Sequence, residues 1–161
     1  MDALRAGLAE AGFPSAQTVG ASGNAIVDVP ASLTGGQVER RVEESLLRTA
    51  GLATDVFVRD RGAWDSVVSG NPFVHEAGED PAHVLVTILK SRPDRAAWAR
   101  LTSAVVGRER TAPGDAHAYL VYPDGIGRSK LTPAVIERSL GVHGTSRNWN
   151  TVLRLAELLR E

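Results

Sequence analysis

This chain is divided into short helices and strands by glycine, proline and helix-capping residues. These closely spaced boundaries limit the folds that the chain can adopt. Thr34 precedes a helical pattern over Gly35–Ala50, and Gly51 ends that pattern, as expected of a capping hydroxyl before a helix and a glycine after it. Pro133 stands at the first position of another predicted helix, which Gly141 ends. The sequence therefore predicts a fold built from many small elements.

Helical and strand-like patterns alternate along the whole chain. Helices are predicted where apolar residues recur every three or four positions, and strands where apolar residues alternate or cluster between turn residues. The predicted helices span residues 2–11, 35–50, 62–69, 94–105, 133–140 and 146–161. The predicted strands span residues 17–19, 25–29, 55–59, 83–89, 109–111 and 118–122, and residues 73–81 are predicted as a polar loop.

This order of elements predicts an α+β fold with two lobes, over residues 1–60 and 61–161. We expect both lobes to be related to ferredoxin-like folds and to contain antiparallel or mixed sheets. The first half follows the split βαββαβ pattern without its leading strand. Because that strand is central in such a sheet, its absence predicts a gap or an exposed edge, which a homodimer could fill.

The composition narrows the function classes. The formal net charge is −1, so the chain has no general attraction for nucleic acid or for anionic membranes. It contains no cysteine, which excludes disulfides and thiolate chemistry. Residues 1–13 do not resemble a signal peptide, and the most apolar segment, residues 84–89, is too short to span a bilayer. We expect a cytoplasmic, bacterial-type protein with no membrane partner.

Gly125–Lys130, with the sequence GIGRSK, forms a first polar segment. Its spacing matches neither a Walker A loop nor a dinucleotide fingerprint. Arg128, Ser129 and Lys130 nevertheless offer charged and hydroxyl donors just before a predicted helix, where free N–H groups and the helix dipole favour an anion. The alternative is an ordinary strand-to-helix loop in which Arg128 pairs with a carboxylate such as that of Asp124.

Ser146–Thr151, with the sequence SRNWNT, forms a second polar segment. Trp149 belongs to the apolar stripe of the last predicted helix and is therefore interpreted as a core residue. Arg147, Asn148 and Asn150 surround it with more polar groups than a helix cap requires. An arginine fork and two amides could grip a phosphate or a carboxylate. Whether the two polar segments meet does not follow from the sequence.

Other candidate groups carry weaker signals. The cluster of His75, Glu76, Glu79, Asp80 and His83 lacks the paired histidines of a helical zinc site and is interpreted as a solvated acidic loop. No metal is predicted, no cofactor can be named, and no catalytic residue is assigned, because Ser129 has no identifiable base.

Several motifs together resemble a known family. The strings YPDGIGRSKLT and SRNWNTVLRLAEL, with the SGN of residues 22–24 and the NPF of residues 71–73, resemble the bacterial domain of unknown function 1697 family. The resemblance implies a two-lobed α+β fold and no established activity or cofactor. Members of that family begin with a strand and a glycine-rich loop ahead of the helix that stands first here.

Three functions remain open on the sequence alone. The first is binding of a small anionic ligand, bearing a phosphate or a carboxylate, by Arg128, Ser129 and Lys130 together with Arg147, Asn148 and Asn150. The second is a structural or interaction role without a ligand. The third is a nucleic-acid-binding module, which the net charge disfavours. The sequence assigns no reaction and does not decide whether the protein is an enzyme.

Overall fold

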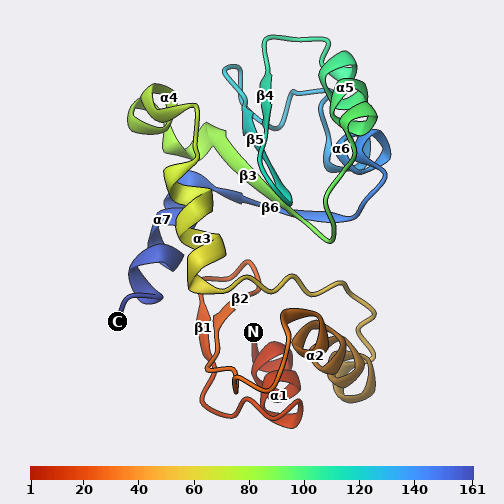
Figure 1. The fold of residues 1–161 in the computed structure, drawn as a ribbon, viewed down its shortest axis with the longest axis vertical. Coiled ribbons are helices and arrows are strands. Elements are labelled where there is room, and N and C mark those ends of the chain that lie inside the picture. The colour runs from red at the N-terminus through yellow and green to blue at the C-terminus, as the bar shows by residue number, and fades with distance from the viewer. The chain divides into compact units, whose positions relative to one another are not determined.

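The computed structural model describes all 161 residues, and the chain divides into two compact units (Figure 1). The first unit comprises Met1–Arg61 with Glu157–Glu161, and the second comprises Gly62–Ala156. The helices are α1 (Asp2–Glu10), α2 (Gly35–Ala50), α3 (Arg61–Ser69), α4 (Val74–Glu79), α5 (Arg95–Ala104), α6 (Pro133–Leu140) and α7 (Trp149–Leu158), with a 3-10 turn, η1 (Pro81–His83). The strands are β1 (Gln17–Val19), β2 (Asn24–Ile26), β3 (Val84–Leu89), β4 (Arg110–Pro113), β5 (His117–Val121) and β6 (Gly144–Asn148).

These elements confirm the predicted α+β class, because helices combine with two separate antiparallel sheets. The ferredoxin-like description of the two lobes stays a prediction. No helix is long and apolar enough to cross a membrane.

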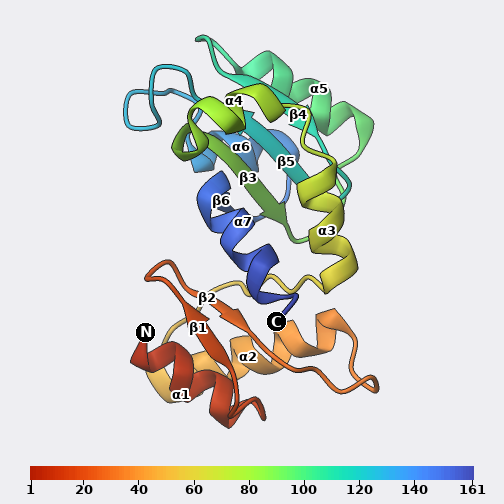
Figure 2. The ribbon, with the colours of Figure 1, turned by 90° about the vertical axis from the view of Figure 1, so that its left-hand side faces the viewer.

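The first unit packs α1 against α2 beside the hairpin of β1 and β2 (Figure 2). The two helices approach closely at Gly7, where an added Cβ would lie 2.6 Å from Leu46 Cδ2. The hydroxyl of Ser45 donates to the Gly7 carbonyl at 2.7 Å across the same contact. The helix boundaries of α2 are as predicted, because Thr34 caps its start and Gly51, with φ 64°, ends it.

The predicted strand over residues 55–59 is wrong. The backbone N–H of Val56 donates to the Glu43 carboxylate at 2.8 Å, and that of Val58 donates to the Glu39 carboxylate at 2.8 Å. Both glutamates belong to α2. Side chains of the neighbouring helix thus take hydrogen bonds that a strand ladder would have taken, and the sheet of this unit has only β1 and β2.

The second unit is built on a four-stranded antiparallel sheet in the order β4-β5-β3-β6. Helices α5 and α6 cover one face, and α3 and α7 lie on the other side (Figure 1). The buried residues between the sheet and α5 and α6 include Leu89, Leu101, Leu120, Tyr122 and Ile136. On the opposite face the Tyr119 hydroxyl donates to the Val67 carbonyl of α3 at 2.8 Å.

Two local predictions in this unit are wrong. The sequence predicts that the last helix begins at Ser146, but Gly144–Asn148 is strand β6 and the helix begins at Trp149. The sequence predicts a loop over residues 73–81, but these residues contain the short helix α4. The polar segment Gly144–Asn148 forms strand β6 because its backbone pairs with β3, where Ser146 lies opposite Thr87. The periodicity of the local sequence does not predict such pairing with a distant strand.

Candidate functional site

A pocket of about 300 Å³ lies beside the first polar segment in the second unit. Its lining comes from two loops, one ahead of β4 and one after β5. Since β4 and β5 are antiparallel, with Arg110 opposite Val121, the start of β4 and the end of β5 lie together and bring these loops into contact. The lining residues are Val106, Gly107, Arg108, Glu109, Asp124, Gly125, Arg128, Ser129 and Lys130.

The loop after β5 is shaped by its own backbone. Gly125 adopts a φ of 86°, a conformation that L side chains rarely adopt, and its N–H donates to the Tyr122 carbonyl at 3.0 Å. The Ser129 N–H donates to the Ile126 carbonyl at 3.2 Å. Thr132 then caps α6 by accepting from the Val135 N–H at 3.3 Å. The first polar segment is therefore a folded turn that leads directly into a capped helix.

Arg108 and Asp124 form a bidentate ion pair at the pocket. Arg108 Nε lies 3.0 Å from Asp124 Oδ2, and Arg108 Nη2 lies 2.8 Å from Asp124 Oδ1. Both side chains are mostly exposed, at 70% and 64%, so the pair contributes little to stability. Asp124 pairs with Arg108 and not with Arg128, so the predicted Arg128–Asp124 pair is wrong, while the alternative of an ordinary strand-to-helix loop stays open.

Glu109 and Ser129 form a second link between the two loops. The Ser129 hydroxyl donates to the Glu109 carboxylate in a short contact and accepts from the Leu131 N–H at 3.0 Å. The hydrogen bond from Ser129 is the main reason that the pKa of Glu109 lies below its usual value, and backbone N–H groups add to the effect. Burial, and then the Glu109 carboxylate, raise the pKa of Tyr122 to about 12.

Arg128 and Lys130 are the cations of the lining that the protein leaves without an acidic partner. Both side chains are exposed. Neither forms a hydrogen bond or an ion pair within the chain, whereas Arg108 is held by Asp124. The lining thus has three cations and two carboxylates, and two of the cations remain available to a ligand.

The second polar segment is used differently. The Ser146 and Thr87 hydroxyls share a hydrogen bond of 2.7 Å. Arg147 Nη1 donates to Thr145 Oγ1 at 2.7 Å and to the Ser146 carbonyl at 2.8 Å, and burial lowers the pKa of the Arg147 guanidinium. Asn148 Oδ1 accepts from the Thr151 N–H at 3.0 Å, so Asn148 caps α7.

The structure therefore brings only part of the predicted site together. Arg128, Ser129 and Lys130 line the pocket, and Arg147, Asn148 and the exposed Asn150 do not. Trp149 is buried, as predicted. Sequence reasoning missed Arg108 and Glu109 as pocket residues. The only signal for them is the succession of two predicted strands, over residues 109–111 and 118–122, because antiparallel pairing of such strands places the loop before the first beside the loop after the second.

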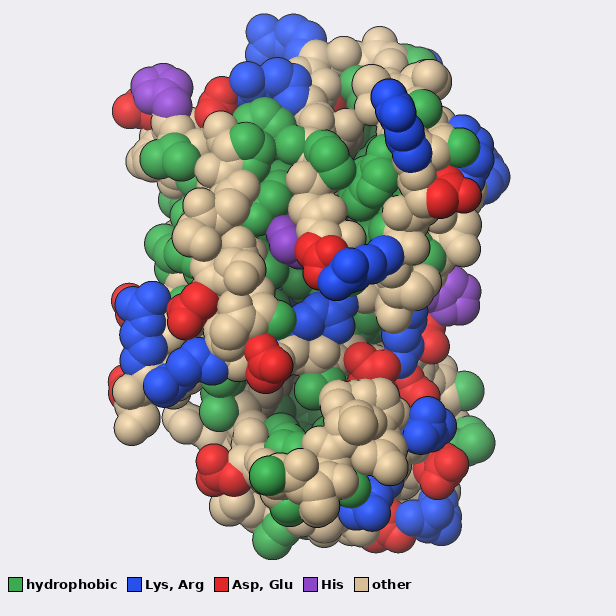
Figure 3. Space-filling model, in the orientation of Figure 1, with side chains coloured by type: hydrophobic (Ala, Val, Ile, Leu, Met, Phe, Trp, Pro, Cys, Tyr) green, Lys and Arg blue, Asp and Glu red, His purple; other side chains and the backbone are tan.

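The acidic stretch before β3 forms local contacts. The Glu76 carboxylate accepts a short hydrogen bond from Arg110, and His83 Nδ1 lies 2.5 Å from Asp80 Oδ2. No group of three or more His, Asp or Glu side chains in the chain is arranged to hold a metal ion. In the view of Figure 3, acidic and basic side chains are interspersed on the surface of each unit.

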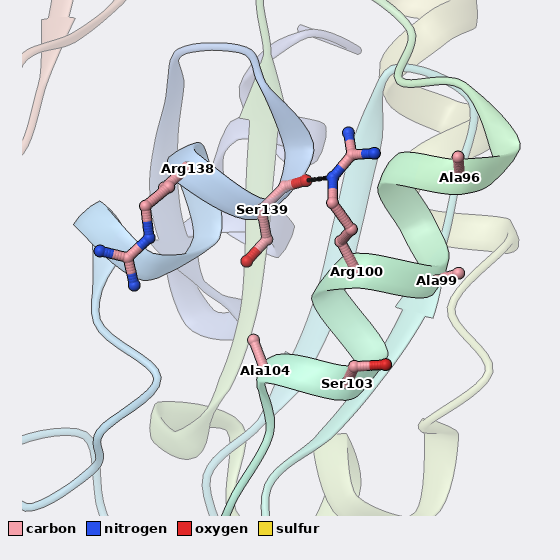
Figure 4. A pocket seen from close by; sticks show the side chains of 7 residues that line it. All are labelled: Ala96, Ala99, Arg100, Ser103, Ala104, Arg138 and Ser139. Atoms are coloured by element: carbon pink, nitrogen blue, oxygen red, sulfur yellow. Dashed lines mark hydrogen bonds between the residues drawn. The ribbon is translucent and has the colours of Figure 1, made fainter.

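A second hollow, of about 570 Å³, lies between α5 and α6. Figure 4 shows its lining, in which Arg100 reaches across to α6 and donates from Nε to the Ser139 carbonyl at 3.0 Å. Arg138 stands on the other side of this hollow and points away from Arg100 (Figure 4). The rest of the lining is small: Ala96, Ala99, Ser103 and Ala104.

The fold and the pocket define a two-unit α+β protein with a small, charged surface pocket beside a helix start. The chain belongs to the family described as "Protein of unknown function (DUF1697)", whose model matches residues 1–119. That match includes the SGN and NPF motifs and the loop with Arg108 and Glu109, but it ends before both polar segments. No curated protein and no solved structure matches the chain.

Proposed function

We propose that the pocket beside the first polar segment binds a small anionic ligand that bears a phosphate or a carboxylate. Arg128 and Lys130 supply the charge, and Arg108 lines the same pocket. The observation that carries this proposal is that Arg128 and Lys130 face no acidic partner of their own, although two carboxylates lie in the same lining. An arginine fork binds such anions bidentately, and a lysine ammonium adds a point charge.

The remaining residues of the predicted site have structural roles or no assigned role in this proposal. Ser129 positions the loop, because its hydroxyl is engaged with Glu109 and with the Leu131 N–H. Asn148 caps α7 and Arg147 is bonded within β6. Participation of Arg147, Asn148 and Asn150 in binding stays a prediction from the sequence.

The exposure of Arg128 and Lys130 determines how tightly we expect the pocket to bind an anion. Charges in contact with water interact weakly, and salt screens them further. Binding of inorganic phosphate alone should therefore be weak, and its affinity should fall as the ionic strength rises.

Calorimetric titration with inorganic phosphate at low salt tests the proposal. We expect the Arg128→Gln/Lys130→Gln variant to bind phosphate about tenfold more weakly than the unchanged protein, because it loses two charge-assisted contacts. Arg138→Gln is the matched control, since Arg138 is an exposed cation in the same unit outside this pocket. Equal affinity in the double variant, or no binding of phosphate and acetate by the unchanged protein, would contradict the proposal.

The structural role is the competing function, and the two links between the loops favour it. Arg108–Asp124 and Glu109–Ser129 hold the loop in place without any ligand. Arg128 takes part in neither link, so a structural role for Arg128 itself would require that its replacement loosen the loop. Equal melting temperatures of the Arg128→Gln variant and the unchanged protein would argue against it.

A further inference from the structure

We infer that the anion in this pocket belongs to a small polyhydroxylated metabolite, of the class of sugar phosphates. This inference rests on the proposed anion binding and goes further by assigning the rest of the ligand. It is carried by the two carboxylates of the lining, Glu109 and Asp124, which lie beside the cations and can still accept hydrogen bonds from a ligand.

Glu109 and Asp124 line the pocket together with the cations. Each carboxylate already accepts hydrogen bonds, from Ser129 and from Arg108 respectively. A carboxylate offers about four lone-pair sites, so both can accept further bonds. A ligand made only of an anionic group leaves these acceptor sites unused, whereas a ligand with hydrogen-bond donors beside its anion can also bind to them.

The donor groups are better supplied by hydroxyls than by an amine. The lining has three cations against two carboxylates, and this excess of positive charge disfavours an ammonium group. Neutral hydroxyls donate to the carboxylates without that cost. In a polyhydroxylated chain or ring with a phosphate, the phosphate therefore matches the cations of the pocket and the hydroxyls match its carboxylates.

The lining also argues against a nucleotide. It contains no aromatic side chain on which a base could stack, and Val106 is its only large apolar residue. Its volume of about 300 Å³ lies at the lower end of ligand pockets. A single small sugar phosphate is the class that this size and polarity favour.

Calorimetric titrations with four probes at one low ionic strength separate the contributions. The probes are inorganic phosphate, ribose, ribose 5-phosphate and adenosine 5′-monophosphate. We expect ribose 5-phosphate to bind about tenfold more tightly than inorganic phosphate, because its hydroxyls add hydrogen bonds to charged acceptors. Ribose alone should not bind measurably, and the nucleotide should bind no more tightly than ribose 5-phosphate.

Two substitutions test the carboxylates directly. Glu109→Gln and Asp124→Asn each remove one negative charge and keep the shape of the side chain. Each should weaken the binding of ribose 5-phosphate about fivefold, through loss of a charged acceptor, while inorganic phosphate binds equally well or more tightly. Asp124→Asn keeps the test valid if Glu109→Gln does not fold, because the Asp124 side chain is mostly exposed.

The outcomes separate this inference from the proposed function. If inorganic phosphate, acetate and ribose 5-phosphate all fail to bind, both proposals are overturned. If phosphate binds and ribose 5-phosphate binds no more tightly, anion binding stands and the sugar-phosphate assignment is overturned. The sugar-phosphate assignment is also overturned if Glu109→Gln and Asp124→Asn strengthen the binding of phosphate and of ribose 5-phosphate equally. It is overturned as well if the nucleotide binds more tightly than ribose 5-phosphate.

Discussion

The two polar segments have similar composition, but the fold uses them in opposite ways. In the first, Arg128 and Lys130 lie exposed beside a pocket and form no hydrogen bond or ion pair with an acidic group. In the second, Ser146, Arg147 and Asn148 each form hydrogen bonds within the chain. Polar side chains that stabilise the fold form hydrogen bonds with other groups of the chain. Polar side chains without such bonds are the better candidates for binding a ligand.

The difference arises from the secondary structure. A strand directs successive side chains to opposite faces, so β6 separates Arg147 from Ser146 and Asn148, and the helix α7 then begins directly after it. The loop after β5 has no such alternation. Its turns allow Arg128, Ser129 and Lys130 to line one pocket.

Ser146→Ala should have the largest effect on stability. Thr87 is only 3% exposed and its hydroxyl shares a hydrogen bond with Ser146, so the substitution leaves a buried hydroxyl without a partner. We expect a loss of about 1–3 kcal/mol in the free energy of unfolding. Thr87→Val combined with Ser146→Ala removes both partners and should cost less than Ser146→Ala alone. Urea denaturation of Ser146→Ala, Thr87→Val and the double variant measures this, and additive losses would contradict the pairing.

Asn148→Ala should have the next largest effect. It removes the side chain that accepts from the Thr151 N–H at the start of α7, and loss of such a cap costs about 1 kcal/mol. Asn148→Asp keeps the acceptor and should restore most of the stability. A stable Asn148→Ala variant would show that the second segment is not used for capping, and would reopen Asn148 as a ligand-binding residue.

Glu109 should titrate below the usual range of a glutamate. Its folded pKa is lowered from 4.5, so its contribution to stability is fully present above the unfolded pKa and is lost as the pH falls through the folded pKa. The contribution is therefore constant from neutral pH down to about 4.5 and declines below it. Carboxylate NMR titration measures the pKa, and Ser129→Ala should raise it. An unchanged pKa in that variant would contradict the Ser129 contact.

Arg128→Gln and Lys130→Gln should have the smallest effect on stability. Both side chains are exposed and unpaired, and surface substitutions of this kind change the free energy of unfolding by about 0.5 kcal/mol or less. Urea denaturation of each variant measures the change. A loss comparable to that of Ser146→Ala would erase the difference between the two segments and would favour a structural role for both.

The sequence was most informative where local chemistry decides the structure. α2 and α6 begin and end as predicted, because Thr34 and Thr132 cap their starts and Gly51 and Gly141 adopt left-handed conformations at their ends. These interactions join residues within a few positions of one another. Such signals are readable from a single sequence.

Two of the errors, over residues 144–148 and 55–59, lie where residues distant in the sequence decide the structure. Strand β6 contains Gly144–Asn148, a polar stretch with no apolar alternation, and it exists because its backbone pairs with β3. Residues 55–59 alternate like a strand, but glutamates of α2 take the N–H groups of Val56 and Val58. The same distinction applies to the candidate site. Arg128, Ser129 and Lys130 are predicted from a local sequence motif, whereas Glu109 lies beside them only because β4 pairs with β5.

Amide chemical-shift mapping during a phosphate titration tests the central claim most directly, because it observes both polar segments in one experiment. We predict saturable shifts for the amides of residues 106–109 and 124–131, with residues 144–151 unchanged. The shifts should be lost in the Arg128→Gln/Lys130→Gln variant and kept in Arg138→Gln. Shifts centred on residues 144–151, or none around the pocket, would contradict the account.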